Sequence, residues 1–124
     1  MIVLLDTHAL LWALSGSPRL SKVALRTIKN PRNTILVSVV SAWEMQIKQQ
    51  LGRLRVPDDL ESVVATAGFT ARLITFADVR RLGELPDHHR DPFDRMLVAQ
   101  ALEAGVPIVT ADAQIAAYQV QIVW

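Results

Sequence analysis

Four acidic residues of this chain, Asp6, Glu44, Asp94 and Asp112, stand at positions where carboxylates can do chemistry. Asp6 and Asp112 each follow an apolar stretch, whereas Glu44 and Asp94 fall among apolar residues of predicted helices. Carboxylates that meet in one crevice repel one another, and the usual remedies are a shared proton or a divalent cation. Magnesium prefers oxygen ligands, and such a cation activates water and stabilises charge on a phosphate. If the four acids converge, the expected chemistry is phosphodiester hydrolysis.

The elements that must position these acids alternate along the chain. The run Ile2–Leu5 has no polar alternation, which is typical of a strand buried on both faces of a parallel sheet. Ligands of open α/β sheets bind beyond the carboxyl ends of the strands, where Asp6 lies. Further strands are predicted over 34–37, 71–75, 107–110 and 120–123, and helices over 9–14, 21–30, 39–51, 57–68, 77–85, 92–104 and 113–117. The pattern predicts a single domain over residues 1–124 with a three-layer α/β/α fold and a mostly parallel central sheet of four to five strands.

Glu44 has two explanations in the helix predicted over 39–51. The apolar stripe of this helix consists of Val40, Trp43, Ile47 and Leu51. Glu44 falls on the same stripe, near its edge, and a carboxylate on a core-facing side is costly unless it is paired, hydrogen-bonded or bound to a cation. In the other explanation Glu44 lies just outside the core, or pairs with Lys48 one turn later. The sequence leaves both open.

Helix capping competes with function for the remaining acids. Asp91 precedes Pro92, so it is expected to be the N-cap of the helix over 92–104. Asp94 lies within the apolar arc of that helix, but an acidic residue in the first turn also favours the helix dipole. Asp112 could cap the short helix that follows it. Capping explains each aspartate singly and does not explain why all of them lie where sheet and helices must meet.

The amino-acid composition of the chain excludes some classes of function and favours others. A net charge of +1 is too small to indicate nucleic-acid binding by bulk electrostatics, although ten of the thirteen basic residues are arginine, the side chain best suited to phosphate. The absence of cysteine excludes disulfides and thiolate metal sites, so a metal must be held by oxygen or imidazole. The 51% hydrophobic content suggests apolar surface buried against a partner. We found no membrane-spanning stretch or signal peptide, and expect a cytoplasmic protein.

Other candidate groups carry less weight. His88 and His89 are adjacent in a polar loop, without the helical spacing of a zinc site, and are interpreted as loop residues near substrate. Trp12 and Trp43 lie on helix faces that look core-directed, so core or dimer packing is favoured over base stacking. The chain has no glycine-rich phosphate loop and no Gly-x-Ser-x-Gly elbow.

The acidic residues lie in segments that resemble the PIN-domain ribonucleases, and among them the VapC-like toxins of prokaryotic toxin-antitoxin pairs. The matching segments are Leu5-Asp6-Thr7-His8, Ser41-Ala42-Trp43-Glu44, Asp91-Pro92-Phe93-Asp94-Arg95, Leu97-Val98-Ala99-Gln100-Ala101 and Ile108-Val109-Thr110-Ala111-Asp112. No single motif is specific, but their order and spacing cover essentially the whole chain. Family members often have asparagine where this chain has His8, which leaves the role of His8 open between substrate contact and packing.

The resemblance implies that Asp6, Glu44, Asp94 and Asp112 are the catalytic and metal-binding residues, with Thr7 and Thr110 as hydroxyl supports. Further candidate supporting residues are Ser41, Asp91 as a cap, and Arg95, for which an ion pair with a neighbouring acid is favoured over a phosphate contact. It also implies an Mg²⁺- or Mn²⁺-dependent endoribonuclease acting as a toxin, an RNA substrate, a homodimer and a cognate antitoxin protein. The alternative is a non-catalytic PIN-fold module that binds an antitoxin or a dimer partner, with its acids serving as caps.

Overall fold

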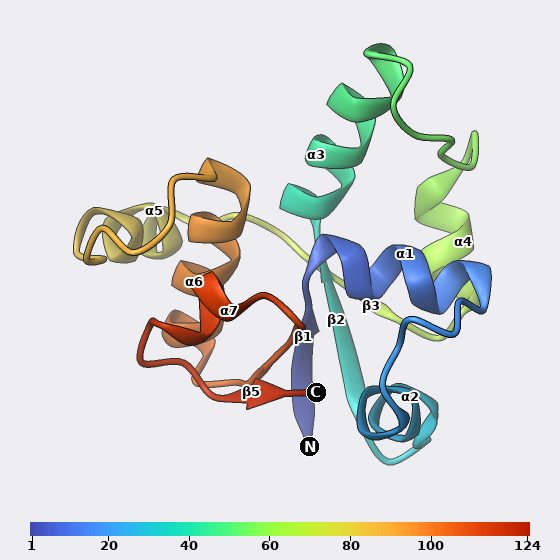
Figure 1. Cartoon of the computed structure of the whole chain (residues 1–124), viewed down its shortest axis with the longest axis horizontal. Helices are drawn as coiled ribbons and strands as arrows, with labels where there is room; N and C mark the ends of the chain where they lie inside the picture. The colour runs from blue at the N-terminus through green and yellow to red at the C-terminus, as the bar shows by residue number, and fades with distance from the viewer.

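A sheet of five parallel strands runs through the centre of the molecule (Figure 1), in a computed structural model that describes residues 1–124. The strands are β1 (Ile2–Leu5), β2 (Thr34–Ser38), β3 (Thr70–Arg72), β4 (Ile108–Val109) and β5 (Ile122–Val123). The helices are α1 (Thr7–Ser15), α2 (Lys22–Lys29), α3 (Val39–Gln50), α4 (Leu60–Thr66), α5 (Phe76–Gly83), α6 (Pro92–Ala104) and α7 (Ala113–Ala116). The predicted α/β class and parallel sheet are confirmed, with five strands. None of the seven helices is both long enough and apolar enough to cross a bilayer.

The strand order β3-β2-β1-β4-β5 places β1 at the centre of the sheet. The chain first builds outward from β1 to β3, then crosses to the other side of β1 to form β4 and β5. Ligands of such sheets bind at the carboxyl edge where the strand order reverses, here between β1 and β4. Leu5 pairs with Val109, so the next residue of β1, Asp6, lies beside Thr110. The topology therefore brings the acids that follow β1 and β4 to one edge.

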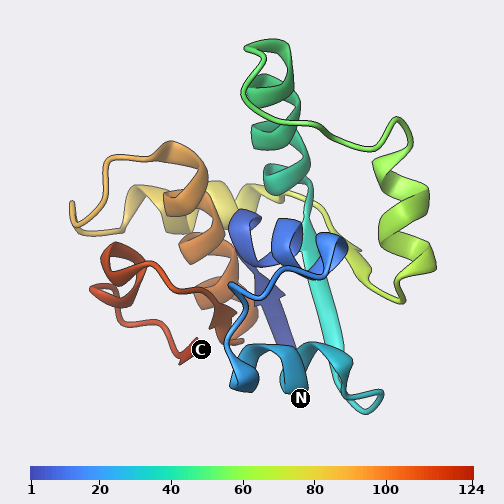
Figure 2. The same cartoon turned by 45° about the vertical axis from the view of Figure 1, so that its right-hand side comes forward.

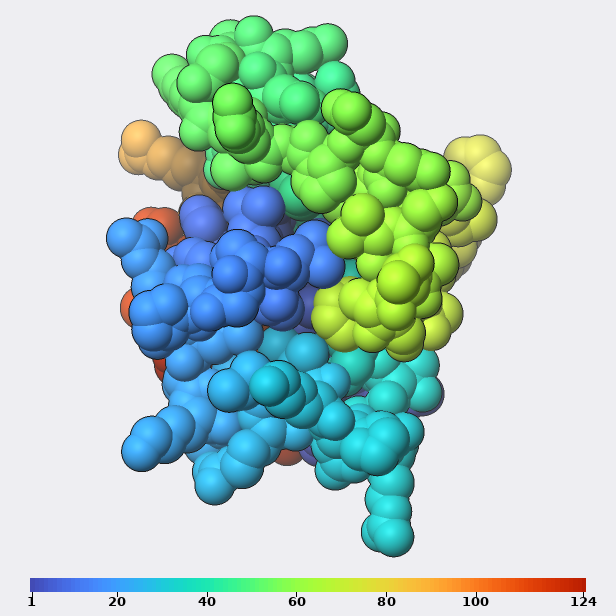
Figure 3. Space-filling model, turned by 90° about the vertical axis from the view of Figure 1, so that its right-hand side faces the viewer, coloured from blue at the N-terminus to red at the C-terminus, as the bar shows by residue number.

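Helices cover both faces of the sheet and enclose two apolar cores. Val3 and Leu5 point to the face covered by α1, α2 and α4, whereas Leu4 points to the face covered by α6 and α7. Figure 2 shows α6 and α7 on the side opposite α4 after a turn of the molecule. Figure 3 shows the first face, where α1 and α2, in blue, lie beside α4, in yellow-green. The alternation of β1 between two cores explains its unbroken apolar sequence.

Several predicted boundaries move by a few residues, and two of these shifts have a clear local reason. The third strand, predicted over 71–75, ends at Arg72 because Thr75 is the N-cap of α5 and forms a capping box with Asp78. The helix predicted to begin at Pro57 begins at Leu60, where the Asp59 side chain accepts the Ser62 N–H at 3.1 Å. In both cases a side chain that caps the helix decides where it begins.

The predicted apolar stripe of α3 is wrong in part. Val40 is fully buried, but Trp43 and Leu51 are 58% and 60% exposed, and the Trp43 ring packs edge-on against Phe93. The buried face of α3 instead contains Val40, Ser41, Glu44 and Met45. Glu44 thus lies within the buried face rather than at its edge, because α3 turns this face toward the carboxyl edge of the sheet.

A buried polar network fixes α5 against α6. Asp78, which is fully buried, accepts hydrogen bonds from Arg72 at 2.7 Å and from Gln100 at 3.3 Å. Although burial alone would raise it, the pKa of Asp78 is lowered by bonds from Thr75 and Arg72. Gln100 also donates to the Leu73 carbonyl at 3.2 Å. This network holds the helix that carries Asp94 in its place on the sheet.

Candidate metal centre

Asp6 and Asp112 each use one carboxylate oxygen as a helix cap and present the other to the edge of the sheet. Asp6 Oδ1 accepts the Ala9 N–H at 2.7 Å, and Asp112 Oδ1 accepts the Gln114 N–H at 2.8 Å. The hydroxyl of Thr110 donates to Asp6 Oδ2 and accepts the Asp112 N–H at 3.0 Å. Capping and a second role are therefore compatible in both residues, and Thr110 links them.

Glu44 is buried and fully hydrogen-bonded. Thr7 Oγ1 donates to Glu44 Oε1 at 2.6 Å and lies 3.0 Å from the Ser41 hydroxyl. Lys48 Nζ lies 2.8 Å from Glu44 Oε2, so the ion pair considered from the sequence is formed. Glu44 is nevertheless only 3% exposed. The two explanations of Glu44 are thus both met: it lies on the buried face and it is paired with Lys48.

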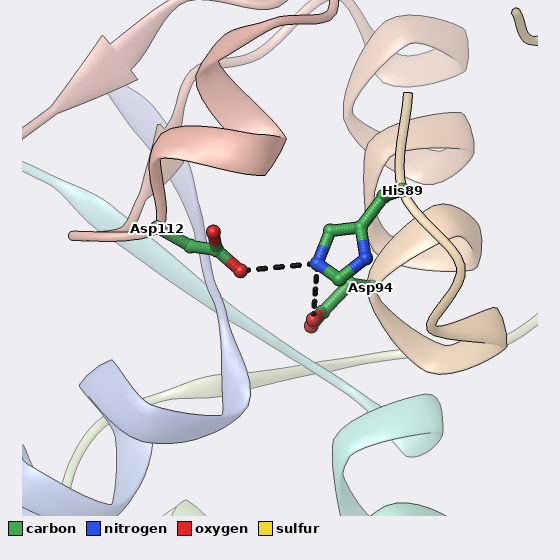
Figure 4. A group of neighbouring side chains, drawn as sticks. All are labelled: His89, Asp94 and Asp112. Atoms are coloured by element: carbon green, nitrogen blue, oxygen red, sulfur yellow. Dashed lines mark hydrogen bonds and ion pairs between the residues drawn. The ribbon is translucent and has the colours of Figure 1, made fainter. Parts of the chain in front are cut away.

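Asp91 and Asp94 separate into different roles at the start of α6. Asp91 is the N-cap, and its Oδ1 accepts the N–H groups of Phe93 and Asp94 at 2.8 and 3.0 Å. The side chain of Asp94 turns the other way, and Figure 4 shows it beside His89 and Asp112. Nε2 of His89 lies 3.1 Å from an oxygen of each carboxylate. The ligand atoms of these three residues all lie within 4.8 Å of one another.

The electrostatics show that the four acids act on one another. Burial, followed by the negative charges of Asp91, Glu44 and Asp6, raises the pKa of Asp94 to about 7. Burial also raises the pKa of Asp6, against the hydrogen bonds from Thr110 and Ala9, and Asp112 adds to the rise. A cation would relieve both effects, because it replaces the missing hydration and offsets the repulsion.

The donor set fits a hard divalent cation. Of the four acids, Asp94 and Asp112 bring their carboxylate oxygens within 4.8 Å of each other. Asp6 and Glu44 lie outside this close group, but their charges reach Asp94 and raise its pKa. Mg²⁺ and Mn²⁺ both take oxygen ligands, and the centre has no sulfur to favour a softer metal. The pKa of Asp94 is raised first by burial and then by the negative charges of Asp91 and Glu44, and a cation would offset the second effect.

Arg95 makes no ion pair, and this prediction is wrong. Its Nη1 donates to the Pro86 carbonyl and to the Tyr118 hydroxyl, each at 3.0 Å. Tyr118 is buried against α7, and its hydroxyl also accepts the His89 N–H at 3.0 Å. Through these two hydrogen bonds, Arg95 links the loop before α6 to the segment after β4.

The aromatic side chains near Asp6 lie around the acidic residues and not among them. His8 is exposed and its ring is 5.6 Å from that of Trp12, and its charge lowers the pKa of Asp6 slightly against burial. Trp12 packs on the first core and contacts Trp124, with ring centres 5.8 Å apart. Trp12 thus follows the predicted core packing, whereas Trp43 is exposed.

The fold and the acidic edge together define an α/β protein with a carboxylate centre at the reversal of strand order. A family model described as the PIN domain matches residues 3–120, and the chain therefore belongs to the PIN domain family. PIN domains are generally nucleases. No curated protein matches the chain in sequence.

Solved structures share this fold at low sequence identity. VapBC2 from Rickettsia felis, bound to a DNA fragment from its promoter, matches with a TM-score of 0.67 and 16% identity, covering 98% of this chain and 97% of that one. VapBC-1 from nontypeable Haemophilus influenzae matches with a TM-score of 0.65 and 16% identity, covering 98% and 96%. FitAcB from Neisseria gonorrhoeae matches with a TM-score of 0.64 and 14% identity, covering 97% and 95%.

Proposed function

We propose that this chain is a divalent-metal-dependent endoribonuclease and the toxin of a toxin-antitoxin pair. The observation that carries the proposal is the acidic edge of the sheet, where Asp94 and Asp112 lie together. Burial, followed by the charges of Asp91, Glu44 and Asp6, raises the pKa of Asp94 there to about 7. Membership of the PIN domain family supports a nuclease. We further propose that residues 1–124 act as one domain, and a cytoplasmic location stays a prediction.

Each residue of the centre has a proposed task. Asp6, Glu44, Asp94 and Asp112 would hold Mg²⁺ or Mn²⁺, which when bound activates water and stabilises charge on the phosphate. Thr110 orients Asp6 through the hydrogen bond to its Oδ2. Thr7 and Ser41 orient Glu44, whose second oxygen is balanced by Lys48. Asp91 fixes the first turn of α6 and so the direction of Asp94.

A polar hollow beside the acids supports a phosphate-bearing substrate. It has a volume of about 300 Å³ and no apolar lining; its walls are Asp87, His88, His89, Arg90, Asp91 and Gln114. Arg90 is exposed there and could pair with a phosphate of the RNA.

Exposed apolar surface supports the proposed protein partners, a cognate antitoxin and a second copy of the chain. Phe76 is 90% exposed on α5, beside Leu73 at 65% and Val79 at 49%. An apolar groove of about 500 Å³ lies between α3 and α4 and shares Leu73 with this patch; its walls also include Val37, Ala42, Leu60, Val64 and Phe69. The solved structures that share the fold are described as VapBC and FitAcB complexes, which supports an antitoxin partner.

Purified protein is expected to cut a pool of random-sequence RNA when Mg²⁺ or Mn²⁺ is present and to leave it intact in EDTA. The reason is that the four carboxylates alone supply neither an activated water nor positive charge for the phosphate. Gel analysis and sequencing of the RNA ends measure the cleavage, and a DNA pool of matched sequence serves as the control.

Two results would count against the proposed function. Equal cleavage in EDTA would show that the activity does not use the acidic centre. Intact RNA in every metal would favour the non-catalytic interaction module, in which the acids only cap helices.

A further inference from the structure

His89 is a buried residue in an otherwise exposed loop. It is 8% exposed, whereas its neighbours Asp87, His88 and Arg90 are exposed. A polar side chain is buried at little cost only when its hydrogen bonds are made within the protein. His89 makes one such bond from its backbone and others from both ring nitrogens.

The hydrogen bond at Nδ1 fixes where the ring proton lies. The Asp91 N–H donates to His89 Nδ1 at 3.1 Å, so Nδ1 presents a lone pair. A neutral imidazole with a lone pair at Nδ1 carries its proton at Nε2, and an imidazolium would have no lone pair to offer. His89 Nε2 is therefore a donor, and it cannot bind a cation through a lone pair.

That N–H forms a hydrogen bond with Asp112, and the same nitrogen lies beside the carboxylate of Asp94. Asp94 Oδ2, at the start of α6, and Asp112 Oδ2, after β4, each lie 3.1 Å from Nε2 (Figure 4). These two acids would otherwise repel each other. The bond to Asp112 holds one carboxylate beside the other without adding a fixed charge or occupying a cation position.

The ring itself is held from outside the centre. The His89 N–H donates to the Tyr118 hydroxyl, which also accepts from Arg95, each at 3.0 Å. Arg95 in turn binds the Pro86 carbonyl at the start of the loop. The backbone of His89 is thus fixed to the segment after α7 directly and to α6 through Arg95, while its ring contacts acids at the starts of α6 and α7.

We propose that His89 is a positioning residue of the metal centre, whose Nε2–H orients the Asp112 carboxylate beside that of Asp94 at the spacing that the cation requires. This inference rests on the proposed function. Groups that hydrogen-bond to metal ligands orient them, and their loss commonly weakens metal affinity about 10- to 100-fold. The same loss is expected here although His89 is not itself a ligand.

Two substitutions separate the roles of the ring nitrogens. His89→Asn keeps an acceptor near Nδ1 for the Asp91 N–H and removes the distant donor, whereas His89→Gln keeps a donor near Nε2. In calorimetric titrations with Mn²⁺, we expect His89→Asn to bind about 10- to 100-fold more weakly than the wild type. His89→Gln is expected to recover most of the affinity. Melting temperatures in EDTA check that both variants are folded.

Long-range ¹H–¹⁵N NMR of the wild type reads the proton position directly. The expected spectrum of His89 is that of a neutral ring protonated at Nε2, both without metal and with diamagnetic Mg²⁺. A ring protonated at Nδ1, an imidazolium or a metal-bound Nε2 would overturn the inference, as would equal Mn²⁺ affinity of His89→Asn and the wild type. Equal losses in both variants would also overturn it, because the donor would then not be the feature that matters. If the wild type bound no cation, the proposed function itself would fail.

Discussion

In metal-free buffer at about pH 8, the Asp94→Asn variant is expected to melt about 10 °C above the wild type. Burial and the nearby charges of Asp91 and Glu44 raise the pKa of Asp94 from 3.8 to about 7. At this pH the ionised side chain destabilises the folded state by on the order of 3 kcal/mol, and asparagine removes the charge. Thermal melts of both proteins in EDTA measure the difference.

The pH dependence of this difference has a definite sign. Between the ordinary pKa of 3.8 and the folded value of about 7, the folded state keeps a proton that the unfolded chain releases. Wild-type stability therefore falls as the pH rises through this window, and the loss is complete above it. The advantage of Asp94→Asn should shrink toward about pH 4. A variant that melts at or below the wild type at about pH 8 would contradict this account.

Mn²⁺ is expected to raise the melting temperature of the wild type and to change that of Asp94→Asn very little. A ligand at 100 times its Kd stabilises the folded state by about 3 kcal/mol. Asp94→Asn lacks one of the four carboxylates and gains much less. The same melts with excess Mn²⁺ should therefore reduce or reverse the difference between the two proteins.

Asp6→Asn is expected to lower metal-dependent RNA cleavage about 1,000-fold. A catalytic cation stabilises the transition state by several kcal/mol, and each 1.36 kcal/mol of stabilisation changes the rate tenfold. Asparagine keeps an oxygen to cap α1 through the Ala9 N–H, so the fold should be retained. Initial rates on a single RNA substrate measure the loss.

Asp59→Asn is the matched control for this substitution. Asp59 is also an N-cap aspartate, and its oxygen accepts the Ser62 N–H at the start of α4, outside the acidic centre. The control should cleave RNA at the wild-type rate. Cleavage by Asp6→Asn within a few-fold of that rate would point to a contaminating nuclease and contradict the assignment of Asp6.

The strand and helix order could be predicted from the sequence because its signals are local. The unbroken apolar run Ile2–Leu5 indicated β1, and the caps Asp91 and Asp112 marked the starts of helices that the structure confirms. The end of β3 was missed because the capping box of Thr75 competes with continued extension of the strand.

The meeting of the acids could be predicted only in part. Alternation along the chain showed that Asp6 and Asp112 follow parallel strands, but nothing local says that β1 and β4 are neighbours. For α3, the stripe through Trp43 was misplaced because a helical wheel contains no information on which face of the helix packs against the sheet. Glu44 was nevertheless placed near a buried surface, where it lies.

The burial of His89 in the loop before α6 could not be predicted from the sequence. Adjacent histidines without helical spacing do not indicate a metal centre, and the signal at His89 is only its place two residues before the cap Asp91. Its burial depends on Tyr118 and Arg95, which come from distant positions in the chain. Such tertiary contacts have no counterpart in local sequence patterns.

The most direct test of the metal centre is calorimetric titration of RNA-free protein with Mn²⁺, comparing the wild type with Asp94→Asn. We expect the wild type to bind the cation and the variant to bind it about 100-fold more weakly, because one carboxylate of the centre is lost. This measurement needs no knowledge of the RNA that is cut. Equal affinity in the two proteins, or no binding by the wild type, would contradict the assignment of these acids to a metal centre.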